Sequence, residues 1–135
     1  MNKTRVIIEK GKDGSFGLYT PDTKCTTLIG EGNTVEEAKE DFNICYQEIL
    51  DYYKEENKPI PEELQNLQFE YEYDVSSMLN EAPFLNVSAT AKYIGINPSL
   101  MRQYKRGQSV SKAQMLKIQN GIREIGRKLA SITLL

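Results

Sequence analysis

Residues 97–108 contain the kinds of side chain with which proteins read double-stranded DNA. On a helix through this segment, six polar side chains would form the outer face: Ser99, Arg102, Gln103, Lys105, Arg106 and Gln108. Arginine and glutamine make paired hydrogen bonds to guanine and adenine edges in the major groove. Lysine, arginine and serine suit phosphate oxygens. We therefore predict that Arg102 and Gln103 contact bases, and that Ser99, Lys105 and Arg106 contact phosphates.

The residues around this face predict two short helices joined by a tight turn. Ser88 would cap a first helix over residues 89–94, which ends at Gly95, where a left-handed residue is needed. Asn97 would cap the second helix, which is expected to run to about Arg106. A proline directly after Asn97 fits the first turn of a helix, because its missing N–H costs nothing there.

The inward side chains of this segment complete the pattern. Ala91 is small enough for the two helices to cross closely, and Ile96 would fill the space between them. Leu100 or Met101, together with Tyr104, would hold the second helix to the core. The segment resembles the helix-turn-helix of the phage-repressor type. The alternative is a generic helical hairpin whose basic face is merely solvated.

Charge is divided unevenly along the chain. Residues 1–74 contain 8 Lys/Arg and 17 Asp/Glu, a net charge of −9, whereas residues 75–135 contain 9 Lys/Arg and 2 Glu, a net charge of +7. Such asymmetry favours two modules whose partners have opposite charge. The basic half suits DNA. The acidic half suits a basic partner, although a solvated acidic surface would have the same composition.

The N-terminal half predicts a small sheet with one long helix. Extended, β-branched or alternating runs indicate four strands, the first two forming a hairpin: residues 5–10, 15–19, 25–32 and 68–73. Thr34 and Glu37 form a capping box that opens an amphipathic helix extending to about Tyr53. We therefore expect an α+β fold, with a β-β-β-α-β domain over residues 1–73 and an all-α domain over residues 74–135.

Two further helices and a tail are expected in the C-terminal half. Asp74 would cap a short helix, and Ser111 would cap a last helix that extends to about Leu129. Ile132 and Leu134 alternate with polar residues, which predicts a short strand. The last helix and the tail are candidates for a dimer contact. An equal alternative is that they only complete the core of their own domain.

The sequence offers little for catalysis. It contains no histidine, the commonest general base and metal ligand at neutral pH. Glu70 and Glu72 alternate with aromatic residues, which places them in solvent rather than around a magnesium ion. Cys25 and Cys45 lack the spacing of a zinc site or a disulfide framework, and Cys45 falls on an apolar helical stripe. We expect no enzyme, no metal site and no cofactor.

The sequence predicts neither targeting to nor insertion into a membrane. The first ten residues are too short and too polar for a signal peptide. No apolar run reaches the length that spans a bilayer. A reduced, cytoplasmic location without a membrane partner is therefore the expectation.

A wider resemblance covers nearly the whole chain. Residues 84–87 (FLNV) and 95–104 (GINPSLMRQY), followed by Gly107, look like the C-terminal region of HicB-type antitoxins. The N-terminal order is also similar, with a hairpin, a strand ending in GEG at residues 30–32, and TVEEA at 34–38 opening the long helix. The chain thus resembles HicB-type antitoxins of type II toxin–antitoxin systems.

This resemblance implies a partial ribonuclease-H-like N-terminal domain that sequesters a small, basic, RNA-cleaving toxin. It also implies a C-terminal domain that represses the antitoxin's own operon by binding operator DNA, as a homodimer or higher homo-oligomer. An acidic surface would complement such a toxin and oppose RNA for the same face. The main alternative is a transcriptional regulator whose N-terminal domain senses a small molecule or binds another regulator.

Overall fold

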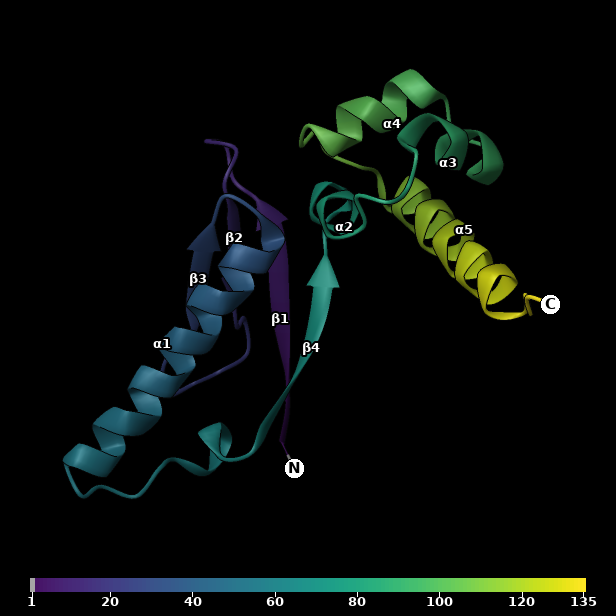
Figure 1. The fold of residues 1–135 in the computed structure, drawn as a ribbon. Helices are drawn as coiled ribbons and strands as arrows, with labels where there is room; N and C mark the ends of the chain where they lie inside the picture. Colours follow the sequence, from purple (N-terminus) through teal and green to yellow (C-terminus); the bar gives the residue numbers. More distant parts are fainter. Residues whose placement is uncertain (1) are drawn as a thin grey trace. The chain divides into compact units, whose positions relative to one another are not determined.

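The computed structural model describes residues 2–135 and has an α+β fold (Figure 1). Within these residues it contains a mixed four-stranded sheet and five α-helices. The chain divides into two compact units, the first ending at Glu81 and the second spanning Ala82–Leu135. The sequence places the boundary after residue 73, so the helix that follows belongs to the first unit instead. Met1, the first residue of the expected N-terminal domain, lies outside the described residues.

The first unit is built on the sheet. Its strands are β1 (Asn2–Lys10), β2 (Phe16–Tyr19), β3 (Ile29–Gly32) and β4 (Leu67–Tyr73), arranged in the order β3-β2-β1-β4. β1 and β2 form the expected antiparallel hairpin, and β3 extends it on the far side of β2. β4 runs parallel to β1. Strands β3 and β4 are therefore the two edges of the sheet.

β3 is shorter than the strand predicted over residues 25–32. The backbone before it bonds to side chains rather than to a neighbouring strand. The amides of Lys24 and Cys25 donate to the Glu63 carboxylate at 2.7 and 3.0 Å. The amide of the buried Leu28 donates to a threonine hydroxyl at 3.0 Å. These side-chain acceptors satisfy backbone amides of the segment without a neighbouring strand, so the segment forms a loop. The sequence pattern does not reveal these acceptors.

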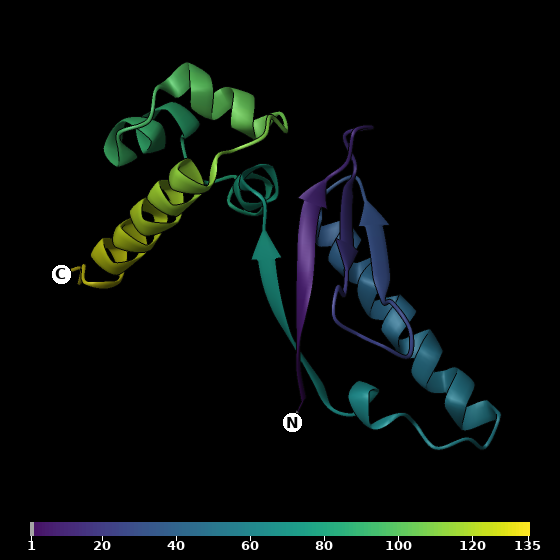
Figure 2. The same ribbon diagram turned by 180° about the vertical axis from the view of Figure 1, so that it is seen from behind.

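The helix α1 (Val35–Glu55) covers one face of the sheet (Figures 1 and 2). Thr34 caps it as predicted, accepting a hydrogen bond from the Glu37 amide at 3.1 Å. Gly30 on β3 allows a very close approach, because a Cβ at that position would lie 2.5 Å from the Ala38 carbonyl oxygen. The glycine at the centre of β3 therefore determines how deeply α1 sits against the sheet.

The core of the first unit lies between α1 and the sheet. Eight buried hydrophobic residues form it: Val6, Ile8, Phe16, Leu18, Leu28, Val35, Ala38 and Phe42. The Phe42 ring meets the Phe69 ring of β4 edge to face, with centroids 4.9 Å apart. Cys45 is half-buried against this cluster, in keeping with its expected apolar role.

Two short helices flank β4. The 3₁₀ helix η1 (Glu62–Leu64) precedes the strand, and α2 (Val75–Glu81) follows it. Asp74 caps α2 as predicted, accepting from the Ser77 amide at 2.7 Å. The same carboxylate accepts from the Lys10 amide at 2.9 Å. Asp74 therefore ties the start of α2 to the end of β1.

Three helices make up most of the second unit: α3 (Val87–Ile94), α4 (Pro98–Lys105) and α5 (Lys112–Ala130). Asn97 and Ser111 cap α4 and α5 as predicted. The predicted cap at Ser88 is wrong. The cap of α3 is Asn86, whose side chain accepts from the Ala89 amide at 2.9 Å. Both residues are good caps, and Asn86 takes the role because α3 begins two residues earlier than predicted.

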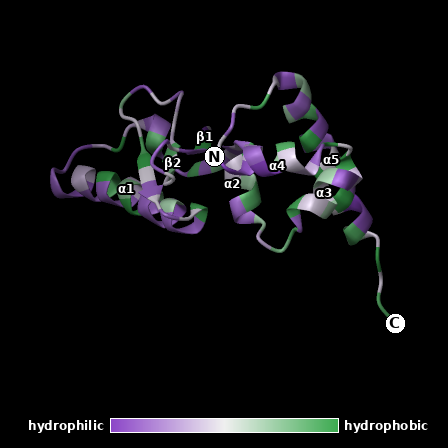
Figure 3. Ribbon diagram, turned by 90° about the horizontal axis from the view of Figure 1, so that it is seen from above, coloured by the Kyte–Doolittle hydropathy of each residue, from purple (hydrophilic) through white to green (hydrophobic). Residues whose placement is uncertain are grey.

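The tail after α5 is irregular. Ser131 is the C-cap of α5, and residues 131–135 contain no strand. The predicted short strand at Ile132 and Leu134 is therefore wrong. The alternation of apolar and polar residues is present, but no strand of the described chain pairs with it. Figure 3 shows hydrophobic residues continuing from α5 into the tail.

Candidate nucleic-acid interface

A short turn joins α3 to α4. Gly95 has a φ of 93°, in the left-handed region that favours glycine. The Ile96 amide donates back to the Ala91 carbonyl at 2.8 Å, which is the longer of the two bonds of a Schellman motif, and the Gly95 amide donates to the same carbonyl at 2.9 Å. Asn97 then begins α4, its side chain accepting from the Ser99 amide at 2.8 Å. The turn and the cap between the two helices are as the sequence predicts.

The inner face of α4 is anchored in the core of the second unit. Met101 is fully buried, Tyr104 is 5% exposed, and Ile96 in the turn is 4% exposed. Of the two predicted anchors at positions 100 and 101, Met101 is the fully buried one and Leu100 is half-buried. Because the anchors lie at positions 101 and 104, the opposite face of α4 is turned outward.

All six predicted DNA contacts are exposed: Ser99, Arg102, Gln103, Lys105, Arg106 and Gln108. A rotation of about 100° per residue places four of them together on the face opposite the anchors: Ser99, Arg102, Gln103 and Arg106. Lys105 lies to the side of this face. Gln108 lies beyond the helix, after Gly107 with its φ of 108°. The Gln108 amide donates to the Gln103 carbonyl at 3.1 Å, which holds the loop beside the end of α4.

Arg102 is held in place by two serines. Its Nη1 donates to Ser88 Oγ at 2.9 Å, and its Nη2 donates to Ser99 Oγ at 3.1 Å. A guanidinium group has five N–H donors, so donors remain for a ligand. Ser88 therefore positions Arg102, a role that the sequence reasoning missed. A serine and an arginine fourteen positions apart in different helices share no sequence pattern.

Two residues of α5 support the turn and were also missed. Lys117 Nζ donates to the Gly95 carbonyl at 2.9 Å. Gly121 is buried against α3, and a Cβ there would lie 2.5 Å from Ile94 Cγ1. A glycine in the middle of an amphipathic helix costs about 1 kcal/mol relative to alanine, which is a signal of close packing that the sequence does offer.

The second unit is strongly basic. Residues 82–135 contain 9 Lys/Arg and one acidic residue, Glu124, a net charge of +8. Six exposed basic side chains lie outside α4 and its C-cap: Lys92, Lys112, Lys117, Arg123, Arg127 and Lys128. Such a concentration of positive charge attracts the phosphate backbone of nucleic acids. The arrangement can therefore supply hydrogen bonds from one helix and electrostatic attraction from the whole unit.

Metal-binding proteins and membrane proteins would show recognisable features in the described part of the chain. Among residues 2–135, no three His, Cys, Asp or Glu side chains come together as a metal site would require. No helix in the same range has the length and apolar character needed to cross a membrane. No protein-family model matches the chain, and no curated protein matches it either.

Proposed function

We propose that the protein is an antitoxin of the HicB type that sequesters a small toxin and represses its own operon. The second unit would bind operator DNA through a helix-turn-helix formed by α3 and α4. The first unit would bind the toxin. The observation that carries this proposal is the outward face of α4, where Ser99, Arg102, Gln103 and Arg106 stand opposite the buried anchors of the same helix.

The local geometry of α3 and α4 favours DNA over a general solvated surface. A left-handed glycine ends α3, and a side-chain cap starts α4 within two residues of it. This fixes the angle between the helices, as insertion of one helix into a major groove requires. Arg102 and Gln103 remain the proposed base contacts, and Ser99, Lys105 and Arg106 the proposed phosphate contacts.

The first unit is better suited to binding a protein than to catalysis. Glu70 and Glu72, on the outer side of β4, are exposed and form ion pairs with Lys3 and Arg5 at 3.6 and 2.7 Å. Carboxylates paired with cations in this way are not gathered to hold magnesium. Residues 1–81 have 8 Lys/Arg and 18 Asp/Glu, a net charge of −10, which complements a basic toxin. We propose that this unit is the partial ribonuclease-H-like domain that the resemblance implies, and the strand order β3-β2-β1-β4 supports this proposal.

Two hollows in the described part of this unit have charged side chains in their walls. One hollow of about 380 Å³ is lined mainly by polar and charged residues, among them Arg5, Asp22 and Glu70. A second hollow, of about 580 Å³, has Glu9 and Glu31 in its wall together with Ile29 and several glycines. Small-molecule sites are mostly apolar with a few polar groups. The first hollow therefore does not suit a small-molecule effector.

A dimer would use the C-terminal half of α5 and the tail. Leu129 is 59% exposed, Ile132 is 56% exposed and Leu134 is 86% exposed. The N-terminal half of α5 is used within the unit, since Ile118 and Gly121 are buried. The two roles considered for this helix therefore divide along its length, with the core at one end and the proposed dimer contact at the other.

Binding of the chain to DNA from the region upstream of its own gene tests the DNA half of the proposal. Arg102→Ala is expected to weaken binding by about 1–3 kcal/mol and to relax specificity at one position, because a paired hydrogen bond to a base is lost. Gln103→Ala is a second variant, and the exposed Gln103 side chain makes no hydrogen bond or ion pair within the described chain. Arg127→Ala, in the last turn of α5, removes the same charge as Arg102→Ala and should weaken binding less, and about equally for all DNA sequences, because it belongs only to the general positive charge of the unit. If Arg102→Ala binds this DNA with the same affinity as the wild type, α4 is not the recognition helix.

Co-expression with the small protein encoded beside this gene tests the other half. A stable complex that restores growth of cells expressing the neighbour is the expected result. If the neighbouring protein is not toxic and forms no complex with this chain, the antitoxin half of the proposal is wrong. The chain would then be a DNA-binding regulator whose acidic unit binds a different partner.

A further inference from the structure

The strand β4 forms one edge of the sheet. The Asp74 amide donates to the Ile8 carbonyl at 3.0 Å, and the Asn2 amide donates to the Asn66 carbonyl at 3.3 Å. Both bonds place even-numbered residues of this segment toward β1. Because backbone groups alternate along a strand, the amides and carbonyls of the odd-numbered residues point away from the sheet: Leu67, Phe69, Tyr71 and Tyr73. Within residues 2–135, no strand pairs with this side of β4.

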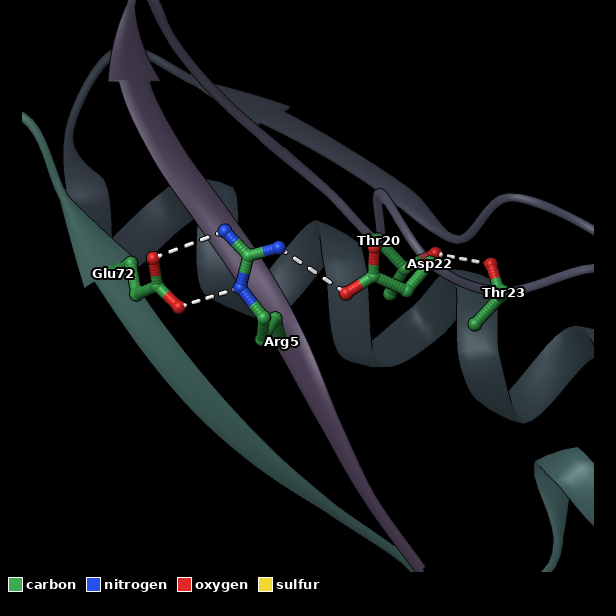
Figure 4. Close-up of polar contacts among 5 residues, drawn as sticks. All are labelled: Arg5, Thr20, Asp22, Thr23 and Glu72. Carbon is green, nitrogen blue, oxygen red and sulfur yellow. Dashed lines mark hydrogen bonds and ion pairs between the residues drawn. The ribbon is translucent and has the colours of Figure 1, made fainter.

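Few of the usual protections against strand pairing are present on β4. Natural edge strands are commonly short, bulged, or interrupted by proline or lysine. β4 has seven residues in continuous register with β1 and contains neither proline nor lysine. Its charged side chains, Glu70 and Glu72, are held by cations of β1. Figure 4 shows Arg5 clasping both oxygens of Glu72, at 2.7 and 3.2 Å, while also reaching Asp22 at 3.2 Å.

The surroundings of this edge select a basic occupant. Residues 59–81 of this unit contain six Asp/Glu and no Lys or Arg. On the α1 side of β4, aromatic rings are half-buried and already receive a cation. Lys39 Nζ lies 4.5 Å from the Tyr71 ring centroid and 5.3 Å from that of Tyr73. A strand bearing lysine or arginine would therefore find aromatic faces on one side and carboxylates on the other.

We infer that a basic strand of the toxin adds to β4 and extends the sheet of the first unit. This inference rests on the proposed antitoxin function and specifies how the toxin is held. Main-chain hydrogen bonds from the odd-numbered residues supply affinity, and the charge around them supplies selectivity. The toxin's strand would be the fifth in the sheet, beside β4.

A second copy of this chain is a poorer occupant of the same edge. In an antiparallel pair of two β4 strands centred on Tyr71, Glu70 of each would lie directly opposite Glu72 of the other. A pair centred on Glu70 would place the two Glu70 side chains opposite each other. Like charges directly opposite across a strand pair are destabilising. The edge is therefore suited to association with a different, basic chain.

The first test compares two charge reversals in the full-length chain, using the product of the neighbouring gene as the probe. Glu70→Lys places a lysine on the edge strand and reverses its charge. Glu48→Lys makes the same change on the exposed side of α1. Glu70→Lys is expected to weaken the complex by about tenfold or more, and Glu48→Lys by far less, because edge lysines oppose strand addition. Equal weakening by both variants would mean that the toxin responds to the overall charge of the unit and not to the edge of β4. That result would overturn the inference.

Amide hydrogen exchange resolved by residue gives the second test and does not depend on a variant that could misfold. In the free chain, the amides of residues 69, 71 and 73 should exchange faster than those of residues 70 and 72. In the complex, the odd-numbered amides should become protected. A stable complex that leaves them unprotected overturns this edge and leaves the antitoxin function intact. Protection of these amides in the free chain at high concentration would mean that a second copy of the chain occupies the edge. Absence of any complex with the neighbouring protein would overturn both this inference and the proposed antitoxin function.

Discussion

The two units of this chain differ in how many large hydrophobic side chains they bury and how many they expose. In the first unit, eight buried hydrophobic residues form one continuous cluster. Three large hydrophobic side chains are exposed there: Ile29, Ile44 and Tyr52. In the second unit the set of buried hydrophobic residues is smaller: Ala91, Ile96, Met101, Tyr104 and Ile118. Seven large hydrophobic side chains are exposed in that unit: Phe84, Tyr93, Leu116, Leu129, Ile132, Leu134 and Leu135.

This difference indicates how each unit meets its partner. The first unit has a complete core. What it leaves without a partner in the described chain is the outer edge of β4, whose backbone amides and carbonyls lie in acidic surroundings. The second unit leaves apolar side chains uncovered at the end of α5 and has basic groups along α4. Exposed apolar patches commonly mark protein interfaces, so the second unit is the one that we expect to self-associate. The first unit is expected to bind a different chain, and its stability should not depend on that partner.

The largest expected effect is a test of whether the two cores are independent. Phe42→Ala removes a fully buried ring from the first unit and should destabilise that unit by about 3–5 kcal/mol. Met101→Ala should act on the second unit, by about 2–5 kcal/mol. Urea unfolding followed by residue-resolved NMR would separate the two transitions. A single transition shifted equally by both variants would show that the cores unfold as one.

The next effect concerns self-association of the second unit. Leu129→Asp should weaken a dimer by about 1.5–3 kcal/mol, because a leucine that becomes buried on association is lost and a charge is introduced. Analytical ultracentrifugation over a range of concentrations measures this change. Leu116→Asp, at another exposed position of α5, is the matched variant. If Leu116→Asp dissociates the dimer and Leu129→Asp does not, the contact lies at the other end of the helix.

A smaller effect separates the phosphate contacts from the base contacts. Arg106→Ala should weaken binding to all DNA sequences about equally and reduce the salt dependence of log K by about 1. Gln103→Ala should change sequence preference and leave the salt dependence unaltered. Both are measured by titrations over a series of salt concentrations. A salt response that is flat in the wild type would contradict electrostatic binding by the second unit.

The smallest expected effect is a pH dependence in the first unit. The Arg5 guanidinium, through its hydrogen bonds, holds the pKa of Glu72 below its ordinary value of 4.5. The stabilisation is therefore present above pH 4.5 and is lost as the pH falls through the lowered pKa of the folded state. Glu72→Gln should slightly lower the urea midpoint at neutral pH, since an exposed pair contributes little. This difference from wild type should shrink below pH 4.5, and a difference that grew in acid would contradict the role of this pair.

The sequence predicted most of the elements because their signals are local. Caps at Thr34, Asp74, Asn97 and Ser111 depend on one side chain and an amide two or three residues later. The left-handed Gly95 and the buried stripe of α4 were predictable for the same reason. A local choice between two good caps, Asn86 and Ser88, was predicted wrongly.

Features that join distant segments were not predictable. The late start of β3 depends in part on the carboxylate of Glu63, far along the chain, which accepts hydrogen bonds from the loop before the strand. The hold of Ser88 on Arg102 and of Lys117 on the turn needs three helices to be in place. In the tail, a local signal was present but misleading. Its apolar and polar residues alternate as in a strand, yet no strand of the described chain pairs with it. A single sequence gives no information on which strand edge stays open, because that follows from the order of the strands.

The most direct test of two units with separate partners measures repression and toxin neutralisation in the same cells. A reporter driven by the upstream DNA and growth in the presence of the neighbouring gene product would be scored for Arg102→Ala and Glu70→Lys. We expect Arg102→Ala to lose repression and keep growth rescue, and Glu70→Lys to lose rescue and keep repression. Loss of both activities in each variant, with the chain still folded, would contradict the division of function between the acidic sheet and the basic helices.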